Sequence, residues 1–453
     1  MGTCASVESA RAGSHPLSRS QPVWLRCAPT IVVALSCIAF APPLAVDGRL
    51  SHLEYTLVTL GVVLLLALLK QRTGSRVPVP VFVLALLAVM AASTLWSSSR
   101  DDTVRDVLTF AVIALAALIL VHIASLNALA VGVALSGVIL LGWAAILILF
   151  GSPEVFTPAG DLLGPYGNRN GLAYALLQSV PAALAMRLAF RNGFVLKWIV
   201  VAALSVGIFA TGSVTSLLVL VIAVVLGAGY VLLRWRRLFG LIYAGCGVIV
   251  LIIVALNVES LLGLLGKSET ISGRIPMWAA LVPLVALRPL TGYGWSLSLP
   301  VGAPPSVAIQ ESLNGVVLYH AHNEVLNWLI TTGVVGAALV VGLYVLVIWA
   351  GIKIVRGPDV WAASWISLGV IVLFLRGVSD ISETLPQGWF VLMLLAAAAA
   401  RYLPAATERR IPRWLVVSIG VPRYSEPSER QTLRTGTIVA SPKLSTLPER
   451  GNS

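Results

Sequence analysis

The sequence predicts an all-α, polytopic membrane protein with about twelve transmembrane helices. Hydrophobic residues make up 58% of the 453 residues and charged residues 11%, whereas soluble domains carry roughly 25% charged residues. Long apolar segments recur along the chain, and most approach the roughly 20 residues that a helix needs to cross a bilayer. These observations exclude a soluble globular enzyme.

The expected spans follow from windows of about 19 residues. Backbone groups cannot remain unpaired in lipid, so each span is expected to be helical or shielded by other helices. The spans fall near residues 28–46, 52–69, 79–97, 104–122, 126–150, 171–189, 194–210, 214–233, 239–258, 323–350, 360–379 and 384–403.

Positive charge predicts the orientation of these spans. The 31 Lys and Arg residues are scattered between apolar segments rather than gathered on one water-facing domain, so the net charge of +12 indicates topology and not a nucleic-acid partner. They concentrate in alternate connections, and the positive-inside rule then places both termini in the cytoplasm, across the cytoplasmic (inner) membrane. Residues 1–27 form a cytoplasmic segment, residues 28–403 the membrane domain, and residues 404–453 a basic tail expected to be disordered and to contact anionic membrane lipids.

One connection is much longer than the others. Residues 259–322 form a large external loop between spans 9 and 10. Within it, Ile275 to Leu287 is apolar but too short to cross a bilayer, so an interfacial or re-entrant helix is expected there.

Four polar clusters fall on the external side under this topology, and the first is Asn168-Arg169-Asn170, at the start of span 6. A guanidinium flanked by two amides at a helix N-terminus can bind a phosphate or sugar oxygen. The alternative is an interfacial arginine that caps the helix and extends to the membrane surface.

The second cluster opens the short apolar helix of the external loop. Ser272 is a natural N-cap, Arg274 lies in the first turn, and Trp278 follows one turn later on the same face. Arg274 and Trp278 can together hold a polar lipid head group or a sugar ring. The alternative is the ordinary start of an amphipathic helix.

The third cluster runs from Arg288 through Pro289 to Gly292, Tyr293 and Gly294. The proline ends the helix, and the glycines permit positive φ and a close approach of the backbone. Exposed backbone N–H groups and Arg288 can receive an oxyanion. The alternative is a simple loop.

The fourth cluster, His320 to Glu324, lies immediately before span 10, which carries Gly333 and Gly336 at helical spacing. Two histidines can bind a metal, but no third ligand pairs with them at a recognised spacing, so no metal is expected. Because imidazole titrates near ~6.5, one histidine can instead take a proton from a hydroxyl nucleophile, held in place by Asn323 or Glu324.

Several cations and one base at the outer membrane surface suit a particular reaction. A lipid carrier with an anionic diphosphate leaving group can be stabilised by arginine pairs without metal, while a histidine activates a sugar hydroxyl. The sequence therefore predicts glycosyl transfer from a lipid-linked donor, with no cofactor and no nucleic acid.

The order of these motifs resembles the O-antigen ligase and O-antigen polymerase superfamily of integral membrane glycosyltransferases. The similarity covers about residues 160–345, from G-P-Y-G-N-R-N-G through S-G-R and P-L-T-G-Y-G to H-A-H-N-E-V-L. It implies transfer of a glycan from an undecaprenyl diphosphate carrier to an acceptor sugar or growing polysaccharide, with inversion and without metal, as in the synthesis of cell-envelope polysaccharides and exopolysaccharide. By motif, His322 matches the essential histidine and Arg274 an essential arginine that holds the donor diphosphate.

The chain departs from this family at one point. Members often carry an arginine after T-G-S at the end of span 7, but here Thr211-Gly212-Ser213 is followed by Val214 and Thr215. Arg169 or Arg288 can substitute, or this branch uses a different donor or has lost activity. The motifs do not separate ligase from polymerase.

A transporter or flippase of a lipid-linked or polar solute is the alternative from another class. Secondary transporters show repeated halves and ionisable residues at midplane depth. The span centres of this chain are almost free of charge, and its halves show no repeat. Glycosyl transfer is therefore the favoured interpretation.

Overall fold

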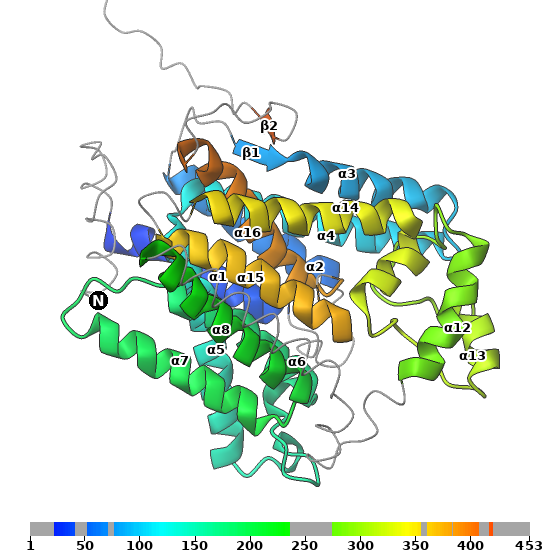
Figure 1. Ribbon diagram of the computed structural model, residues 1–453, viewed down its shortest axis with the longest axis horizontal. Helices are drawn as coiled ribbons and strands as arrows, with labels where there is room; N and C mark the ends of the chain where they lie inside the picture. The colour runs from blue at the N-terminus through cyan, green and yellow to red at the C-terminus, as the bar shows by residue number, and fades with distance from the viewer. Residues whose placement is uncertain are drawn as a thin grey trace, which may run out of the picture.

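The computed structural model describes residues 22–40, 52–70, 77–235, 274–354, 360–382, 384–406 and 416–419. Within these residues the chain is mostly helical (Figure 1). The helices are α1 (Val23–Ala39), α2 (His52–Lys70), α3 (Val81–Ala92), α4 (Arg100–Ile123), α5 (Leu126–Leu149), α6 (Arg169–Ala185), α7 (Gly193–Ala210), α8 (Val214–Trp235), α12 (Arg274–Leu287), α13 (Ser306–Ser312), α14 (Glu324–Ile354), α15 (Val360–Ser379) and α16 (Pro386–Ala406).

The helices confirm the all-α class. Every expected span except the ninth overlaps one of them, and the ninth, residues 239–258, lies outside the described residues. Among the residues that the structure describes, four helices are long and apolar enough to cross a membrane: α4, α5, α7 and α14. The number twelve remains a prediction.

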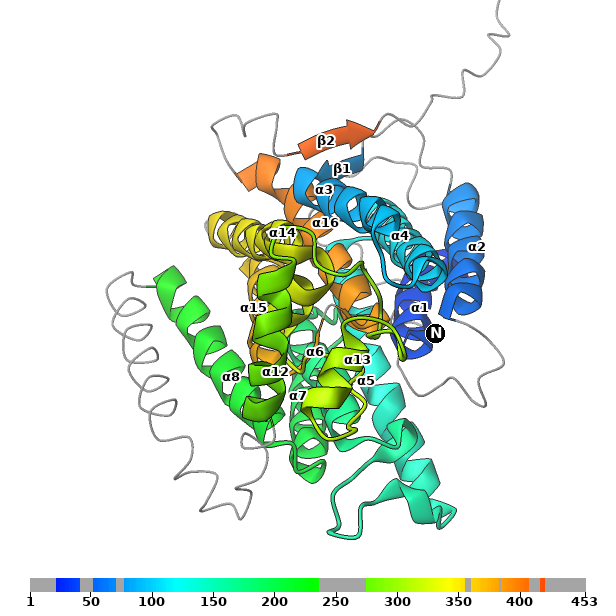
Figure 2. The same ribbon diagram turned by 90° about the vertical axis from the view of Figure 1, so that its right-hand side faces the viewer.

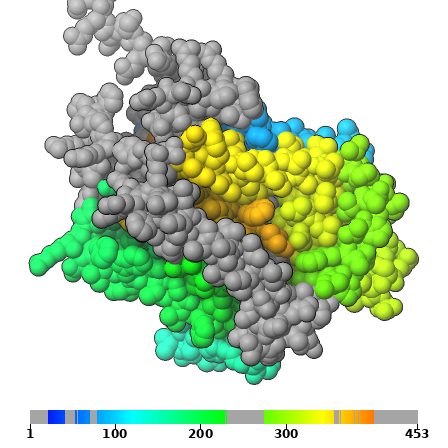
Figure 3. Space-filling view, in the orientation of Figure 1, coloured from blue at the N-terminus to red at the C-terminus, as the bar shows by residue number. Residues whose placement is uncertain are grey.

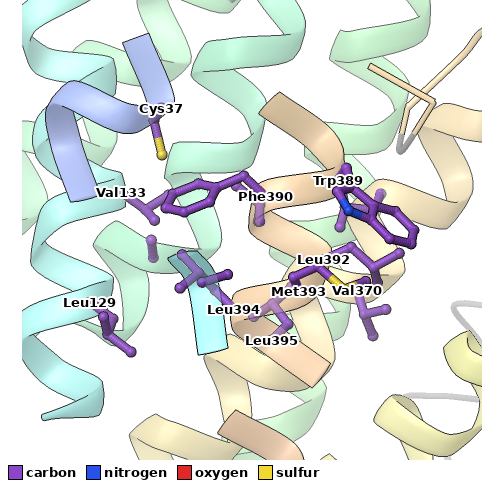
Figure 4. Packing of buried hydrophobic residues seen from close by; sticks show 14 of the residues in the cluster. Cys37, Leu129, Val133, Val370, Trp389, Phe390, Leu392, Met393, Leu394 and Leu395 are labelled. Carbon is purple, nitrogen blue, oxygen red and sulfur yellow. The ribbon is translucent and has the colours of Figure 1, made fainter. Parts of the chain in front are cut away.

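The core of the bundle is built around α16, which lies among the other helices in both views (Figures 1 and 2). From Trp389 to Ala400 every residue is buried. Figure 4 shows Trp389 and Phe390 among apolar side chains from several helices. Trp389 also donates its Nε1–H to the carbonyl of Phe110, at 2.9 Å. The small residues Ala396–Ala400 let neighbouring helices approach closely, which is a common way to pack membrane helices.

Helix α14 is broken at Gly333, where φ is 69° and ψ is −168°. The backbone of the preceding loop fills the break: Val334 N–H donates to Pro289 O at 2.8 Å, and Tyr293 N–H donates to Ile330 O at 2.9 Å. A Cβ on Gly333 would collide with the backbone of Leu290. The expectation that Gly333 simply continues the helix is therefore wrong, because positive φ and this close contact both require glycine.

The external loop contains the short helix predicted over 275–287, which is confirmed as α12 (Arg274–Leu287). Together α12 and α13 form one end of the molecule, beside the first turns of α14 (Figures 1 and 3). The loop is also anchored to the α3–α4 connection. Ser98 N–H donates to Tyr293 O at 3.0 Å, and Leu297 N–H donates to Asp106 Oδ2 at 2.8 Å. These bonds fix the position of α12.

The segment after α16 differs in part from its expected disorder. Val416–Ile419 form strand β2, which pairs antiparallel with β1 (Val77–Pro80). The rest of the predicted tail beyond α16 lies outside the described residues. Pro78 and Pro80 lack a backbone N–H, which limits the number of hydrogen bonds in this short ladder.

Candidate active site

His322 lies in the short connection between α13 and α14, and it contacts a residue that sequence reasoning did not select. Its Nδ1 is 2.9 Å from Oδ1 of Asp380, which directly follows the last residue of α15. Asp380 is buried, and its Oδ1 also accepts a bond from the N–H of Ile381 at 3.0 Å. The backbone of His322 has φ of 47°, a conformation uncommon outside glycine. A rare backbone conformation thus holds the imidazole against a buried carboxylate.

Two arginines share the same carboxylate. Arg376, one turn before Asp380 on α15, donates from Nη2 to Oδ2 at 2.7 Å. Arg274, at the start of α12, places Nη2 at 3.9 Å from the same oxygen. Arg376 is buried and also lies over the ring of Tyr174, with 5.6 Å from Cζ to the ring centroid. Asp380 therefore joins α12, α15 and the histidine segment into one polar cluster.

The segment that carries His322 is fixed on both sides. Trp278 donates Nε1–H to Ala321 O at 2.9 Å. Asn323 caps α14, since its Oδ1 accepts from Leu326 N–H at 3.0 Å while its Nδ2 donates to Val378 O at 2.9 Å. Trp278 thereby helps to position His322, because it holds the backbone of the preceding residue, Ala321.

Glu324 is buried, and its carboxylate accepts bonds from the backbone N–H groups of Ser382 and Thr384 and from the Thr384 hydroxyl. These bonds tie the turn after α15 to the first turn of α14. The expectation that Asn323 or Glu324 holds the imidazole is wrong, because Asp380 does so and the other two position the surrounding backbone.

A pocket opens beside Asp380. Four separate parts of the chain meet there: the start of α6, the turn between α7 and α8, the start of α12 and the end of α15. Its walls therefore carry three guanidinium groups and one carboxylate. The lining residues are Arg169, Asn170, Gly212, Ser213, Val214, Thr215, Arg274, Arg376 and Asp380.

Arg169 lies beside the turn that lacks the family's arginine. Its Nη1 forms an ion pair with Oδ2 of Asp161. Gly212 has φ of 59°, and a Cβ there would collide with the Asp161 carboxylate. Asn168 caps α6, because its Oδ1 accepts from the N–H groups of Asn170 and Gly171 at 2.8 and 3.2 Å. Arg169 thus brings a guanidinium to the pocket wall formed by Gly212–Thr215, and Asn168 acts as a helix cap.

Arg288 and Tyr293 do not line this pocket. The Cζ of Arg288 lies 4.8 Å from the ring centroid of Tyr293, whose hydroxyl donates to Leu284 O at 3.2 Å. The N–H groups of Tyr293 and Gly294 are bonded to α14, and that of Gly292 to Arg288 O. These three backbone N–H groups are therefore already used within the protein, and a role for Arg288 in binding an oxyanion stays a prediction.

The imidazoles of the site are neutral at physiological pH. Burial lowers the pKa of His322 to about 4, and the charges of Arg274 and Arg376 act in the same direction. Burial likewise lowers the pKa of His320 to about 3, and that ring packs edge-on against His322 at a centroid distance of 4.0 Å. Since a carboxylate can only accept, Nδ1 of His322 carries the proton toward Asp380, and Nε2 carries the lone pair.

Asp380 is a third residue that could bind a metal together with His320 and His322, and the spacing of the sequence did not reveal it. His320, His322 and Asp380 offer ligand atoms that all lie within 4.8 Å of one another. Two guanidinium groups, from Arg376 and Arg274, already face the Asp380 carboxylate. Their positive charge opposes a divalent cation at this point and favours an anion in the adjoining pocket.

Sequence reasoning missed Arg376 and Asp380, although a signal was present. Arg376 lies inside the apolar span predicted over 360–379, and Asp380 lies directly after it. Ionisable residues within a membrane span mark functional sites by default. That rule, applied to individual spans, would have selected Arg376, and Asp380 follows it one helical turn later.

Part of this site, including Arg274 and His322, lies in a region that is similar to known proteins. Residues 199–341 match the family model described as O-Antigen ligase. Over this region the chain is similar to O-antigen ligases, and this similarity and the apolar helices together indicate a multi-pass membrane protein. A curated relative is the "Exopolysaccharide production protein ExoQ" of Rhizobium meliloti (strain 1021), which is 26% identical over 152 residues. That match covers 32% of this chain and 35% of the relative, so it spans about a third of either protein.

Proposed function

We propose that this protein transfers a glycan from an undecaprenyl diphosphate-linked donor to an acceptor sugar or a growing polysaccharide, at the outer face of the cytoplasmic membrane. The observation that carries this proposal is the His322–Asp380 pair, which adjoins a pocket with three arginines. The relative's name, which refers to exopolysaccharide production, supports the same class of reaction.

The pocket suits the diphosphate of the donor. Arg169, Arg274 and Arg376 reach it from three different helices. Arginine pairs with phosphate oxygens through two parallel hydrogen bonds, so it both binds and orients the group. Val214 and Thr215, in the first turn of α8, also line the pocket, and the positive end of a helix dipole adds to the attraction for an anion.

The imidazole supplies the base for a single displacement. Nε2 of His322 takes the proton from the acceptor hydroxyl, and the resulting oxygen attacks the anomeric carbon of the donor sugar. The new C–O bond forms as the bond from that carbon to the diphosphate oxygen breaks, and the lipid diphosphate leaves with the electron pair. One displacement of this kind inverts the anomeric centre. Asp380 stabilises the imidazolium that forms and keeps the ring in the tautomer with its lone pair on Nε2.

Arginine charge replaces a metal ion in this proposal. The developing charge on the leaving diphosphate is stabilised by fixed guanidinium groups in a partly buried pocket, where electrostatic interactions are stronger than in water. The Arg376–Asp380 ion pair keeps one of these cations in position before the substrate binds.

Reconstitution tests the proposed function. The purified full-length protein is placed in liposomes with a lipid diphosphate-linked glycan and candidate acceptors, and mass analysis identifies the molecule that gains the glycan. Transfer is expected for the wild type and absent for His322→Ala, while His122→Gln, a histidine at the far end of α4, keeps wild-type activity. Wild-type product levels from His322→Ala would refute the assignment. The identity of the acceptor separates ligase from polymerase.

A further inference from the structure

A second polar pocket lies at the other end of the bundle. It is formed by the start of α5, the end of α6 and the start of α15. The candidate active site lies at the start of α6 and the end of α15, so the length of these helices separates the two pockets by on the order of 25 Å. The pocket residues used below are Asn127, Arg187, Trp361 and Trp365.

The polar groups of this pocket are mainly donors without an acid among them. Trp365 is 1% exposed, and its buried Nε1–H has no hydrogen-bond partner within the part of the chain that the structure describes. Arg187 is anchored through its backbone, because Asn127 bonds both its N–H, at 2.7 Å, and its carbonyl, at 3.0 Å. No Asp or Glu among the described residues lines the pocket. A buried N–H without an acceptor and a guanidinium whose backbone is anchored, both on the wall of one pocket, favour an anion there.

A second cation lies next to the pocket. Lys197, in the first turns of α7, is 7% exposed, and its Nζ lies 4.1 Å from the ring centroid of Trp361. A cation over the face of a tryptophan ring is held in place by the ring quadrupole. Lys197 thus approaches Trp361 from α7, and Arg187, in the α6–α7 connection, lines the same pocket as Trp361.

The neighbouring surface indicates that the anion belongs to a lipid. On α7, Phe194 is 72% exposed and Trp198 47% exposed, and their rings meet edge-on at 6.1 Å. Exposed aromatic rings beside Lys and Arg are typical of the level where lipid head groups meet the hydrocarbon layer. A free phosphate ion cannot bury these exposed aromatic rings, whereas a phospholipid bound at the same place covers them with its acyl chains.

We propose that this pocket binds the phosphate group of an anionic phospholipid in the leaflet opposite to the active site. The phosphate accepts from the Trp365 indole and the Arg187 guanidinium, with Lys197 adding positive charge from α7. The lipid then joins the ends of α5, α6, α7 and α15 at one point. This site is separate from glycosyl transfer, and binding can be measured without any transfer assay.

Native mass spectrometry of the full-length protein tests the proposal. The protein is purified from nanodiscs that contain phosphatidylcholine with or without phosphatidylglycerol, and the retained lipids are counted. We expect one phosphatidylglycerol to be retained selectively by the wild type. Its retention should fall at least fivefold in Arg187→Ala and in Trp365→Phe, which removes the N–H but keeps a buried ring. Arg191→Ala is the matched control, since Arg191 is an exposed arginine in the same α6–α7 connection that does not line the pocket.

Three outcomes would overturn the proposal. Equal retention of both lipids by the wild type would remove the selectivity for an anion. Unchanged retention of phosphatidylglycerol in both Arg187→Ala and Trp365→Phe would place any bound lipid elsewhere. Displacement of the lipid by millimolar inorganic phosphate would assign the pocket to a free ion. Thermal unfolding of each variant shows whether a variant that loses lipid retention has also lost its fold. If Arg187→Ala is unfolded, the retention of phosphatidylglycerol by Trp365→Phe decides the test.

Discussion

Asp380 is the residue on which the candidate site depends most. Its Oδ1 faces His322 and its Oδ2 faces Arg376 and Arg274. One carboxylate therefore orients the proposed base and holds two of the three cations of the donor pocket. The cost of burying this charge is offset by the two guanidinium groups and by the bond from Ile381 N–H.

Replacement of Asp380 by asparagine should separate turnover from donor binding. The amide cannot stabilise an imidazolium and can favour the wrong tautomer of His322, so we expect kcat to fall about 100-fold, within the range of a general base's contribution. The KM for the donor should stay within about threefold, because the cations remain. The matched control is Asp102→Asn, an exposed acid paired with Arg105. A purely structural role for Asp380 would instead lower the amount of folded protein and leave the kcat of that fraction unchanged.

The pH dependence of transfer should reflect the shielded imidazole. Because the pKa of His322 is lowered to about 4, the neutral base persists at pH values where a free imidazole, with a pKa of ~6.5, is protonated. Single-turnover rates should be flat from about pH 8 to about pH 5.5 and fall as the pH decreases through about 4. A decline centred near the free imidazole value would contradict the buried environment described for His322.

At the scale of the elements, the break in α14 positions the external loop. The backbone of residues 289–294 fills the break at Gly333, and Gly292, with φ of 61°, would place a Cβ 2.5 Å from the carbonyl carbon of Thr331. This contact fixes the end of α12, and α12 carries Arg274 into the pocket. Close packing of the backbone therefore explains why Gly333 and Gly292 are glycines.

Gly333→Ala should weaken both the fold and the reaction. The methyl group meets the backbone of Leu290, and alanine is strained at positive φ, so we expect a loss of about 1–3 kcal/mol in the free energy of unfolding. Transfer should also fall, because α12 is displaced. Gly142→Ala, in α5 with nothing within 4 Å of an added Cβ, should be neutral or stabilising by up to ~1 kcal/mol. Thermal unfolding in detergent compares the two variants, and an equal effect of both would contradict the proposed packing.

At the scale of the whole molecule, the sequence predicted the class better than the site. Apolar length is a local property, so the helices could be placed from single windows. The neighbours of His322 could not be predicted in this way, because Asp380 lies 58 residues further along the chain. The packing of α14 against α15 is a tertiary contact, and no local sequence pattern contains it. The proximity of Arg169 to the turn after α7 likewise depends on how α6, α7 and α8 pack.

In the cluster from Arg288 to Gly294, the sequence predicted a ligand where the structure has a contact within the protein. Its glycines predict the close approach of a ligand, but the group that approaches Gly292 is the backbone of α14 and the group that approaches Gly294 is Ser97. Sequence alone cannot distinguish a glycine that admits a ligand from one that admits another helix. Arg288 is a candidate for an oxyanion because of its positive charge; its guanidinium lies over the ring of Tyr293, and its role in substrate binding stays a prediction.

Binding of undecaprenyl diphosphate, which carries no glycan to transfer, tests most directly whether one pocket holds the donor and the base. Its affinity for the full-length protein and the rate of glycan transfer are measured for the wild type, Arg274→Ala, Arg274→Lys and His322→Ala. The account predicts at least about tenfold weaker binding for Arg274→Ala. Arg274→Lys should recover part of this affinity unless the arginine pairs with the diphosphate through two hydrogen bonds. His322→Ala should bind with near-normal affinity and transfer no glycan. Wild-type affinity in Arg274→Ala together with wild-type transfer in His322→Ala would contradict it.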